Sequence, residues 1–352
     1  MEVVSLRAVK SRRPRTSVDF LARMQERNME RALADAQLPP WPDNMRGVPN
    51  GVLRSALFSA TKRGTRRYIE RETIASVKGV SIIYTGPRLD QSDLDVWEGV
   101  LQVARLVKLG DRVEFTQKGF LRLIERGGPN GNSIGKSDRE WLRTVLARLQ
   151  ATAVEITQGP SAYVGSLIDE CSRDDGNNGR CVVVLNPKMR VLFNRDSWTQ
   201  IDWNIRRALI GHPLAQWLHG FYSTHAAPIP YKAETLRHLC GSESGESACT
   251  EPKRHKALLN WIALSLIPAL RALENAYRDA GQPFSGKVGA DGLVSISRFP
   301  SASQQRHLRA RAEDRRAHLN AGDRLRHRGG IEQERGGQRQ TQGGDRTNTT
   351  GG

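Results

Sequence analysis

The segment SDLDVWEGVLQVARLVKLGDRVEFTQKGFLRLIER, residues 92–126, decides the fold class of this chain. Its first part repeats apolar residues at helical spacing, and Ser92 and Gly110 suit the two ends of a helix. The run RVEFT that follows is typical of a short strand, and Thr116 can cap a helix over 117–126. The segment therefore predicts a helix, a strand and a second helix in close succession.

A glycine-rich stretch, GGPNGNSIGKS at 127–137, comes next and has the look of a nucleotide-binding loop. A Walker A motif has four residues between its first glycine and Gly-Lys-Ser, but Asn130 holds that glycine's position and Gly131 is one residue too close. ATP binding is therefore not expected, and the glycines are interpreted as a tight turn into a helix over 138–150. Four apolar residues follow the i, i+3, i+4, i+7 rule in that helix: Leu142, Val145, Leu146 and Leu149.

The flanking sequence completes the pattern of one domain. A helix, two strands, two helices and a hairpin, in this order, indicate a winged helix. The remaining predicted elements are a helix over 51–61, strands over 67–77 and 80–86, and strands over 151–157 and 180–193, the last turning at Asn186-Pro187.

A second unit repeats this order without repeating the sequence. It consists of predicted helices over 200–226, 232–241 and 253–281 and a hairpin over 284–299, with bends expected at Pro213 and Pro268. The fold class is therefore expected to be α+β, with two tandem winged-helix domains and flexible basic arms. The expected boundaries are a basic N-terminal arm at 1–40, winged helices at 41–197 and 198–300, and a disordered basic tail at 301–352.

The charge of the chain favours a polyanionic partner. Lys and Arg number 54 against 37 Asp and Glu, a formal charge of +17, so nucleic acid is the first expectation, although ribosomal and membrane-surface proteins can be equally basic. The most apolar stretch, 257–270, is shorter than the roughly 18 residues of a spanning helix and contains Asn260. The start lacks the apolar core of a secretory signal. We therefore expect a cytoplasmic protein without a membrane span.

Catalytic and metal chemistry find little support. The four cysteines are too widely spaced within each pair for a zinc site and are expected to be free thiols. The histidines are scattered, and the carboxylates Asp93 and Asp95 are expected on an ordinary helix surface. We therefore predict no catalytic residue, metal or cofactor.

Each domain has one helix suited to the major groove of DNA. In the first, Arg139 and Arg143 lie opposite the apolar face, while Lys136, Ser137 and the helix N-terminus are expected to meet a phosphate. The alternative is that the two arginines form a solvated helix face.

In the second domain, Lys253, Lys256 and Asn260 form a polar stripe, since lysine suits phosphate and asparagine suits adenine. The alternative is again a solvated face. The buried side of this helix is expected to hold Leu258, Leu259, Ile262 and Leu266, and backbone contacts from the two wings are expected at Lys188, Arg190 and Lys287.

Three stretches, LPPWPDNMRGVPNGVLRSALF (38–58), LDQSDLDVWEGVLQVAR (89–105) and HPLAQWLHGFYSTHAAPIPYKAETLRHLCGS (212–242), together resemble the TrfA family of plasmid replication initiators. The likeness covers about 38–300. It implies tandem winged helices that bind direct repeats (iterons) at a plasmid origin as monomers and open the adjacent AT-rich DNA. It also implies loading of the replicative helicase with the host initiator DnaA, and dimers that restrain replication and so control copy number.

Initiators of this kind are also expected to bind the host sliding clamp through a glutamine followed by apolar anchors. Gln91, Leu94 and Trp97 are the candidates here, although Leu94 and Trp97 equally suit the core face of their helix. A sequence-specific transcriptional repressor is the alternative function, because it needs the same DNA contacts.

Overall fold

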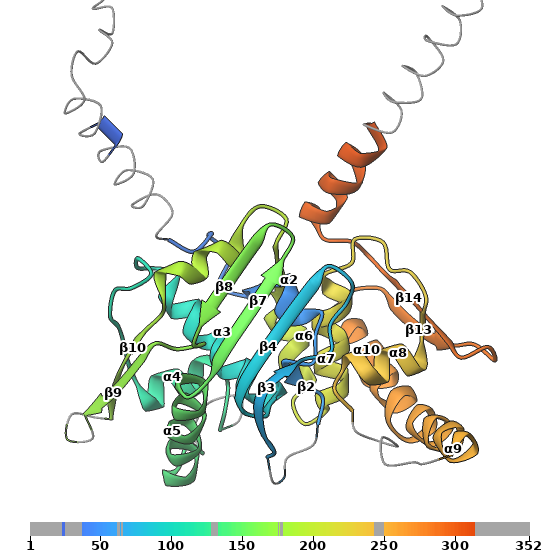
Figure 1. Ribbon diagram of the computed structural model, residues 1–352, viewed down its shortest axis with the longest axis horizontal. Helices are drawn as coiled ribbons and strands as arrows, with labels where there is room; N and C mark the ends of the chain where they lie inside the picture. The colour runs from blue at the N-terminus through green and yellow to red at the C-terminus, as the bar shows by residue number, and fades with distance from the viewer. Residues whose placement is uncertain are drawn as a thin grey trace, which may run out of the picture. The chain divides into compact units, whose positions relative to one another are not determined.

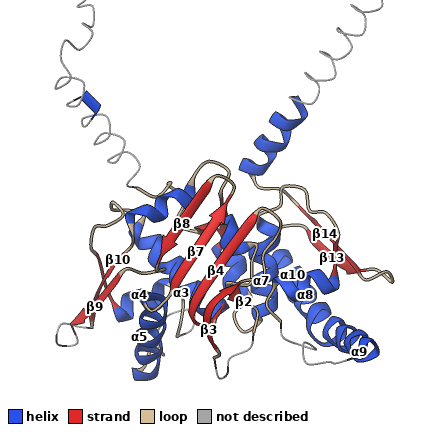
Figure 2. Ribbon diagram, viewed as in Figure 1, coloured by secondary structure: helices blue, strands red, loops and turns tan. Residues whose placement is uncertain are grey.

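The computed structural model describes residues 23–24, 37–61, 64, 66–127, 133–174, 176, 179–242 and 250–313. The fold is mixed α+β (Figures 1 and 2). The described residues up to Arg298 form one compact unit, and within it the buried apolar side chains form two clusters. The first cluster draws on residues from Leu38 to Trp203, and the second on residues from Ile205 to Ile296.

The segment 92–126 forms the helix, strand and helix that its pattern predicts, with a different first cap. The carboxylate of Asp90 accepts hydrogen bonds from the backbone N–H groups of Ser92 and Asp93, at 2.9 and 3.2 Å. Thr116 caps the second helix as predicted, accepting from the N–H of Gly119 at 3.1 Å. The elements that follow one another here are α3 (Gln91–Ala104), β6 (Val113–Thr116), α4 (Gln117–Leu123) and α5 (Lys136–Gln150).

Two antiparallel sheets replace the single hairpin expected after α5. The strand predicted over 151–157 pairs with the strand that directly follows it, over 161–165, and joins a four-stranded sheet. The strand at the start of the predicted 180–193 run pairs with β6 instead. The four-stranded sheet has the order β3 (Tyr68–Thr73), β4 (Val80–Pro87), β7 (Ala153–Gln158) and β8 (Ser161–Gly165), and the three-stranded sheet has the order β6, β10 (Arg180–Val184) and β9 (Glu170–Asp174).

Two short strand pairs connect residues 45–59 to later parts of the chain. The helix predicted over 51–61 is only α2 (Asn50–Leu53), because the chain then turns and enters a parallel strand pair. These pairs are β1 (Met45–Pro49) with β11 (Trp198–Asp202), antiparallel, and β2 (Phe58–Ser59) with β5 (Leu89–Asp90), parallel.

The long helix predicted over 200–226 is broken into three elements. Residues up to Asp202 form β11, α6 (Trp203–Ala208) follows, and Pro213 begins α7 (Pro213–Ser223) instead of bending a longer helix. Gly211, at φ +90°, makes the turn that separates the two helices.

The remaining elements of the second cluster follow one another as a strand, two helices and a hairpin. The three-stranded sheet has the order β12, β14, β13. The elements are β12 (Tyr231–Lys232), α8 (Ala233–Leu239), α9 (Glu251–Trp261), the π-helical segment η2 (Ile262–Leu266), α10 (Ile267–Asp279), β13 (Phe284–Val288) and β14 (Leu293–Arg298).

The elements α9, η2 and α10 form one continuous helix from Glu251 to Asp279. Pro268 does not end this helix, because the π-helical segment η2 lies directly before it. The N–H of Ile267 bonds to the carbonyl of Ile262, five residues earlier, which widens the turn where Pro268 has no N–H to donate. The continuous helix from Glu251 to Asp279 is long and apolar enough to cross a membrane by length and composition alone, and 28% of its most apolar window is buried. A helix of this kind is weak support for a membrane span.

The sequence predicts disorder from residue 301, but residues 302–313 are helical. The Ser301 hydroxyl accepts from the N–H of Gln304 at 3.3 Å, and the Gln304 side chain accepts from the N–H of Ser301 at 3.0 Å. This reciprocal cap starts the helix. The rest of the predicted tail, and the N-terminal arm except residues 23–24 and 37–40, lie outside the described residues.

Candidate nucleic-acid interface

The start of α5 is held by a carboxylate of its own first turn. Asp138 accepts a hydrogen bond from the N–H of Gly135 at 3.0 Å and another from Nε of Arg126 at 3.0 Å. The hydrogen bond from Gly135 lowers the pKa of Asp138. Arg126 also stacks on the ring of Trp141, 3.7 Å from its centroid. The Asp138 carboxylate therefore already occupies the N–H of Gly135, which weakens the expectation that this helix end binds a phosphate.

The two faces of α5 follow the predicted division. Leu142, Val145, Leu146 and Leu149 are all buried. Lys136, Ser137 and Arg139 are exposed, whereas Arg143 is half-buried and lies 3.5 Å from the carboxylate of Glu140. Arg139 is therefore better placed than Arg143 for a base contact.

Replacing Arg139 with alanine is expected to reduce affinity for the preferred DNA about tenfold, because a bidentate arginine–guanine contact contributes roughly 1–3 kcal/mol of discrimination. Competition binding against mutated duplexes measures this change. Arg139→Lys keeps the charge and is expected to retain non-specific binding while losing the same discrimination. Unchanged sequence preference in both folded variants would place base recognition elsewhere.

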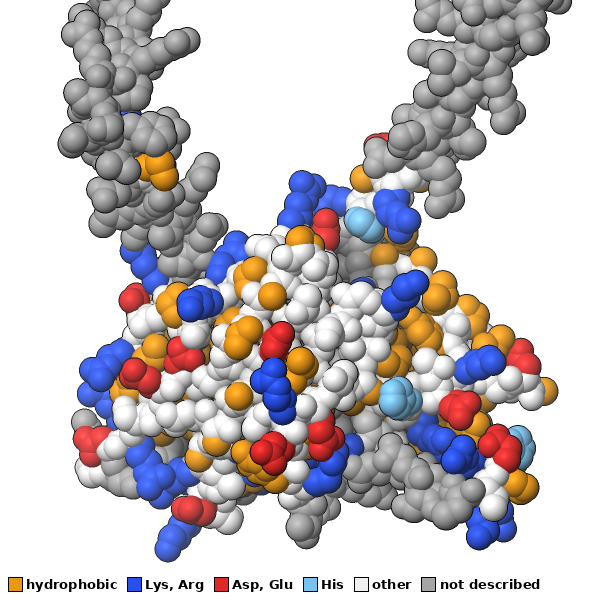
Figure 3. Space-filling view, viewed as in Figure 1, with side chains coloured by type: hydrophobic (Ala, Val, Ile, Leu, Met, Phe, Trp, Pro, Cys, Tyr) orange, Lys and Arg blue, Asp and Glu red, His pale blue; other side chains and the backbone are white. Residues whose placement is uncertain are grey.

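The first turns of α9 project from the protein body. Residues 251–256 are all exposed, so they present basic side chains on several sides of the helix. Figure 1 places α5 and α9 at the same edge of the molecule, and Figure 3 shows Lys and Arg side chains over both. The predicted stripe covers only part of this run, since the sequence KRHK also supplies Arg254 and His255. The exposed predicted contacts are Lys253, Lys256 and Asn260.

The apolar side of this helix is less buried than the sequence predicts. Leu266 is buried, Leu258 and Ile262 are half-buried, but Leu259 is 51% exposed. The prediction for Leu259 is wrong because α9 extends beyond the body at this point and no element of the described chain covers it.

The wing predicted around Asn186-Pro187 is not a hairpin. Asn186 accepts a hydrogen bond from the N–H of Lys188 at 2.9 Å and begins a 3₁₀ helix, η1 (Pro187–Phe193). Lys188 is exposed on it, while Arg190 is half-buried and donates to the carbonyl of Phe193 at 2.8 Å. Neither residue therefore lies on a wing.

The hairpin that joins the first three-stranded sheet is β9–β10. Its sequence, RDDGNNGR, contains Asp-Gly and Asn-Gly pairs that are typical of tight hairpins and could have located it. Arg180 on β10 pairs with Glu114 on β6. In the second hairpin, Lys287 lies on β13 and is exposed, as predicted.

The candidate clamp-binding residues are in the core. Gln91, Leu94 and Trp97 are at most 3% exposed. The Gln91 amide donates to the carbonyl of Phe58 at 2.5 Å, and the Trp97 indole donates to the carbonyl of Leu167 at 3.1 Å. These contacts make the three residues inaccessible to a partner, so the clamp prediction at this position is wrong.

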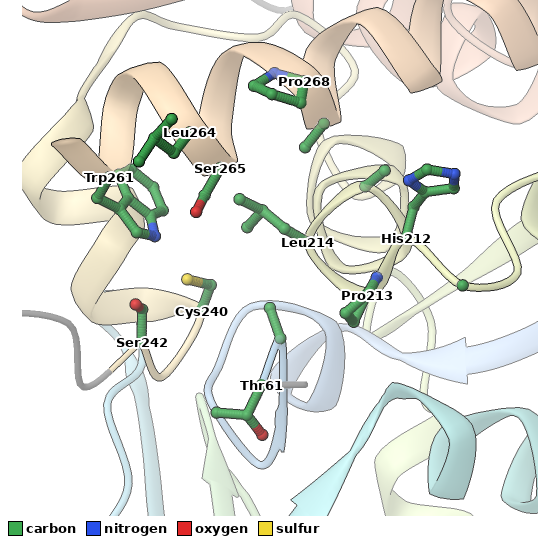
Figure 4. A pocket seen from close by; sticks show the side chains of 14 residues that line it. Thr61, His212, Pro213, Leu214, Cys240, Ser242, Trp261, Leu264, Ser265 and Pro268 are labelled. Carbon is green, nitrogen blue, oxygen red and sulfur yellow. The ribbon is translucent and has the colours of Figure 1, made fainter. Parts of the chain in front are cut away.

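A cavity of about 430 Å³ lies between α7 and the helix formed by α9, η2 and α10. Figure 4 shows Trp261, Leu264 and Ser265 lining it opposite Leu214. Burial raises the pKa of the Cys240 thiol to about 12, and its Sγ donates to the carbonyl of Arg237. The described lining therefore offers an unreactive thiol and a mixture of apolar and polar side chains, the polar ones being Thr61, His212, Ser242 and Ser265.

Comparison with known proteins gives matches in sequence and in structure. The model of the TrfA protein family matches residues 10–257, which starts earlier and ends sooner than the resemblance over 38–300. The plasmid replication initiator protein TrfA of Escherichia coli is 34% identical over 232 residues, or 63% of this chain and 57% of that protein. The chain thus matches little more than half the length of this curated relative.

Two crystal structures of domains 2 and 3 of RctB match at 11% and 12% identity. They cover 70% and 71% of this chain and 96% and 98% of the RctB chains, with TM-scores of 0.41 and 0.44. TM-scores below 0.5 do not establish a shared fold. The family model, by contrast, covers well over half of the sequence, and on that ground the chain belongs to the TrfA family.

Proposed function

We infer that this chain is a plasmid replication initiator that binds direct repeats at an origin through two winged helices, within 41–197 and 198–300. The observation that carries the proposal is one element order found twice. In each copy the strand between the first two helices pairs with the second strand of the hairpin. The first series is α3, β6, α4, α5, β9 and β10, with β7 and β8 inserted between α5 and β9. The second series is α7, β12, α8, α9 with α10, β13 and β14.

The third helix of each series is the proposed reading element. A winged helix inserts that helix into the major groove, and here α5 and α9 each present basic side chains from the same edge of the molecule. The formal charge of +17 supports the phosphate contacts that such binding requires. We therefore assign phosphate contacts to Lys136, Lys253 and Lys256, and base contacts to Arg139 and Asn260.

Family membership supports the remaining steps of the proposal. The chain would open AT-rich DNA beside the repeats and recruit host DnaA and the replicative helicase. A sliding-clamp contact would need residues other than Gln91, Leu94 and Trp97. Self-association would limit copy number. The chain would act by binding in the cytoplasm and not as an enzyme.

A footprint of the purified protein on the plasmid's own origin, with permanganate added to detect unpaired thymines, tests the proposal. Protection of regularly spaced repeats with reactive thymines beside them is the expected result when DnaA is supplied. Protection without any reactive thymine, with and without DnaA, would support the repressor instead. No protection at any repeat would overturn the proposed DNA site.

A further inference from the structure

The proposed reading helix α5 is fastened to α3 by a buried ion pair. Arg148, near the C-terminal end of α5, pairs with Oδ1 of Asp93, while Nη1 of Arg66 donates to Oδ2 of the same carboxylate at 2.7 Å. The Asp93 side chain is 0% exposed. Burial raises the pKa of Asp93 to about 6, as expected for a carboxylate removed from water. The surface carboxylate expected from the sequence is thus a buried link between two helices.

A second set of buried polar contacts links α6 and α7 to α3. Arg206 of α6, whose side chain is 1% exposed, lies with Nε 2.8 Å from Oδ1 of Asp95 and 2.9 Å from Oε2 of Glu98. Its Nη2 donates to the backbone carbonyl of Gln91 at 3.2 Å. From α7, the Gln216 amide donates to Oδ2 of Asp95 at 3.3 Å. Burial raises the pKa of Glu98 to about 7.

Through these two sets of contacts, α3 links the proposed reading helices α5 and α9. Asp93, Asp95 and Glu98 lie within two turns of α3. On one side, Arg148 connects α3 to α5. On the other side, Arg206 and Gln216 connect α3 to α6 and α7, and α7 packs against α10, which is continuous with α9. Hence α3 lies between the two helices that are proposed to touch DNA.

Buried ion pairs are better suited to fixing a geometry than to adding stability. The cost of removing both charges from water offsets most of their attraction, so a well-packed apolar replacement is often neutral. A displaced partner, in contrast, leaves an unpaired charge in the interior, which is strongly unfavourable. A shift of α5 or α6 relative to α3 would create such a charge.

We propose that Asp93, Asp95 and Glu98, with Arg148 and Arg206, are positioning residues that hold α5 and α9 at one separation, so that the protein accepts only one spacing between the two parts of its DNA site. This inference rests on the proposed function. It assigns the spacing requirement of the DNA site to α3, which makes no DNA contact in the proposal.

Binding to duplexes of altered spacing tests this inference. The probe is the protected origin repeat, used unchanged or with one or two base pairs inserted at its centre; each insertion moves the two parts by about 3.4 Å and rotates them by roughly 35°. The variants are Asp95→Asn/Glu98→Gln/Arg206→Met and Asp93→Asn/Arg148→Met, which remove each arginine together with the carboxylates that it faces. Arg66, the second partner of Asp93, keeps its ion pair with Asp90. Glu72→Gln/Arg67→Met, an exposed ion pair at β3 of the four-stranded sheet, is the matched control.

The full-length protein is expected to lose about tenfold in affinity on insertion, because its two halves no longer engage together. The two interior variants are expected to lose less than about threefold, since relaxed halves can follow the displaced sites. The control should behave as the parent, and Arg206→Lys, which keeps the charge without the planar fork, should fall between.

The outcomes separate this inference from the proposed function. If the unaltered protein binds no repeat, the DNA-binding proposal fails. If it binds with a clear spacing requirement and the folded interior variants have the same requirement, the positioning role is wrong. Equal weakening on all spacings by variants with unchanged melting curves would also overturn it.

Discussion

Replacing Lys253 and Lys256 together with alanine is expected to weaken binding to the origin repeat by about 50-fold at 0.1 M salt. Each phosphate contact contributes about −0.9 to the slope of log affinity against log salt concentration. Losing two contacts therefore makes this slope less steep by about 1.8. Both side chains are exposed on the projecting turns of α9, so stability should change by less than about 0.5 kcal/mol. Fluorescence anisotropy at several salt concentrations measures both quantities.

The matched control for this double variant removes the same charge from the same continuous helix. Arg271 and Arg278 lie exposed on α10, beyond η2, and Arg278 is 3.5 Å from Asp279. Arg271→Ala/Arg278→Ala should retain most of the slope if contacts are local to α9. An equal loss of slope in both double variants would mean that overall charge, and not this helix, drives binding.

The sequence predicted best those parts of the fold that local signals determine. The apolar repeat Leu142, Val145, Leu146 and Leu149 located α5 and its buried face, and Thr116 capped α4 as expected. Strand pairing was harder, because apolar β-branched runs do not identify their partners. The run over 180–193 therefore looked like one bent hairpin, whereas β10 pairs with β6 and β9, and Asn186 starts a 3₁₀ helix.

The interior acidic residues could not have been predicted from spacing. Asp93 and Asp95 interrupt an apolar helix and have the composition of a solvated face. Their partners, Arg148 and Arg206, lie 55 and 111 residues further along the chain. Only the packing of α5 and α6 on α3 brings these arginines close enough to make burial of the acids tolerable.

The exposed basic residues were predicted more successfully than their surroundings. A helix with Lys253, Lys256 and Asn260 on one stripe leaves that stripe outside whichever way its apolar face packs. The exposure of Leu259 depends instead on how far α9 extends past its neighbours, which is a tertiary property. Composition and periodicity therefore located candidate DNA contacts but gave no separation between them.

Replacing Trp97 with alanine is expected to lower the free energy of unfolding by about 3–5 kcal/mol, the usual cost of a large buried aromatic. Trp97 is 0% exposed, its ring centroid lies 5.8 Å from that of Phe58, and its indole N–H donates to the carbonyl of Leu167. Urea unfolding followed by circular dichroism measures the loss. Leu106→Ala, at a position just beyond the same helix that is 71% exposed, is the control and should stay within about 0.5 kcal/mol.

This prediction also tests the core role that the structure gives to Gln91, Leu94 and Trp97. A core tryptophan changes stability first, and any loss of replication follows the fraction of unfolded protein. A partner-binding tryptophan would do the reverse: the variant would keep its unfolding midpoint while losing a host contact. An unchanged midpoint in Trp97→Ala would contradict the packing of α3, because no rearrangement of Phe58 and Leu167 could replace the volume and the hydrogen bond that the indole provides.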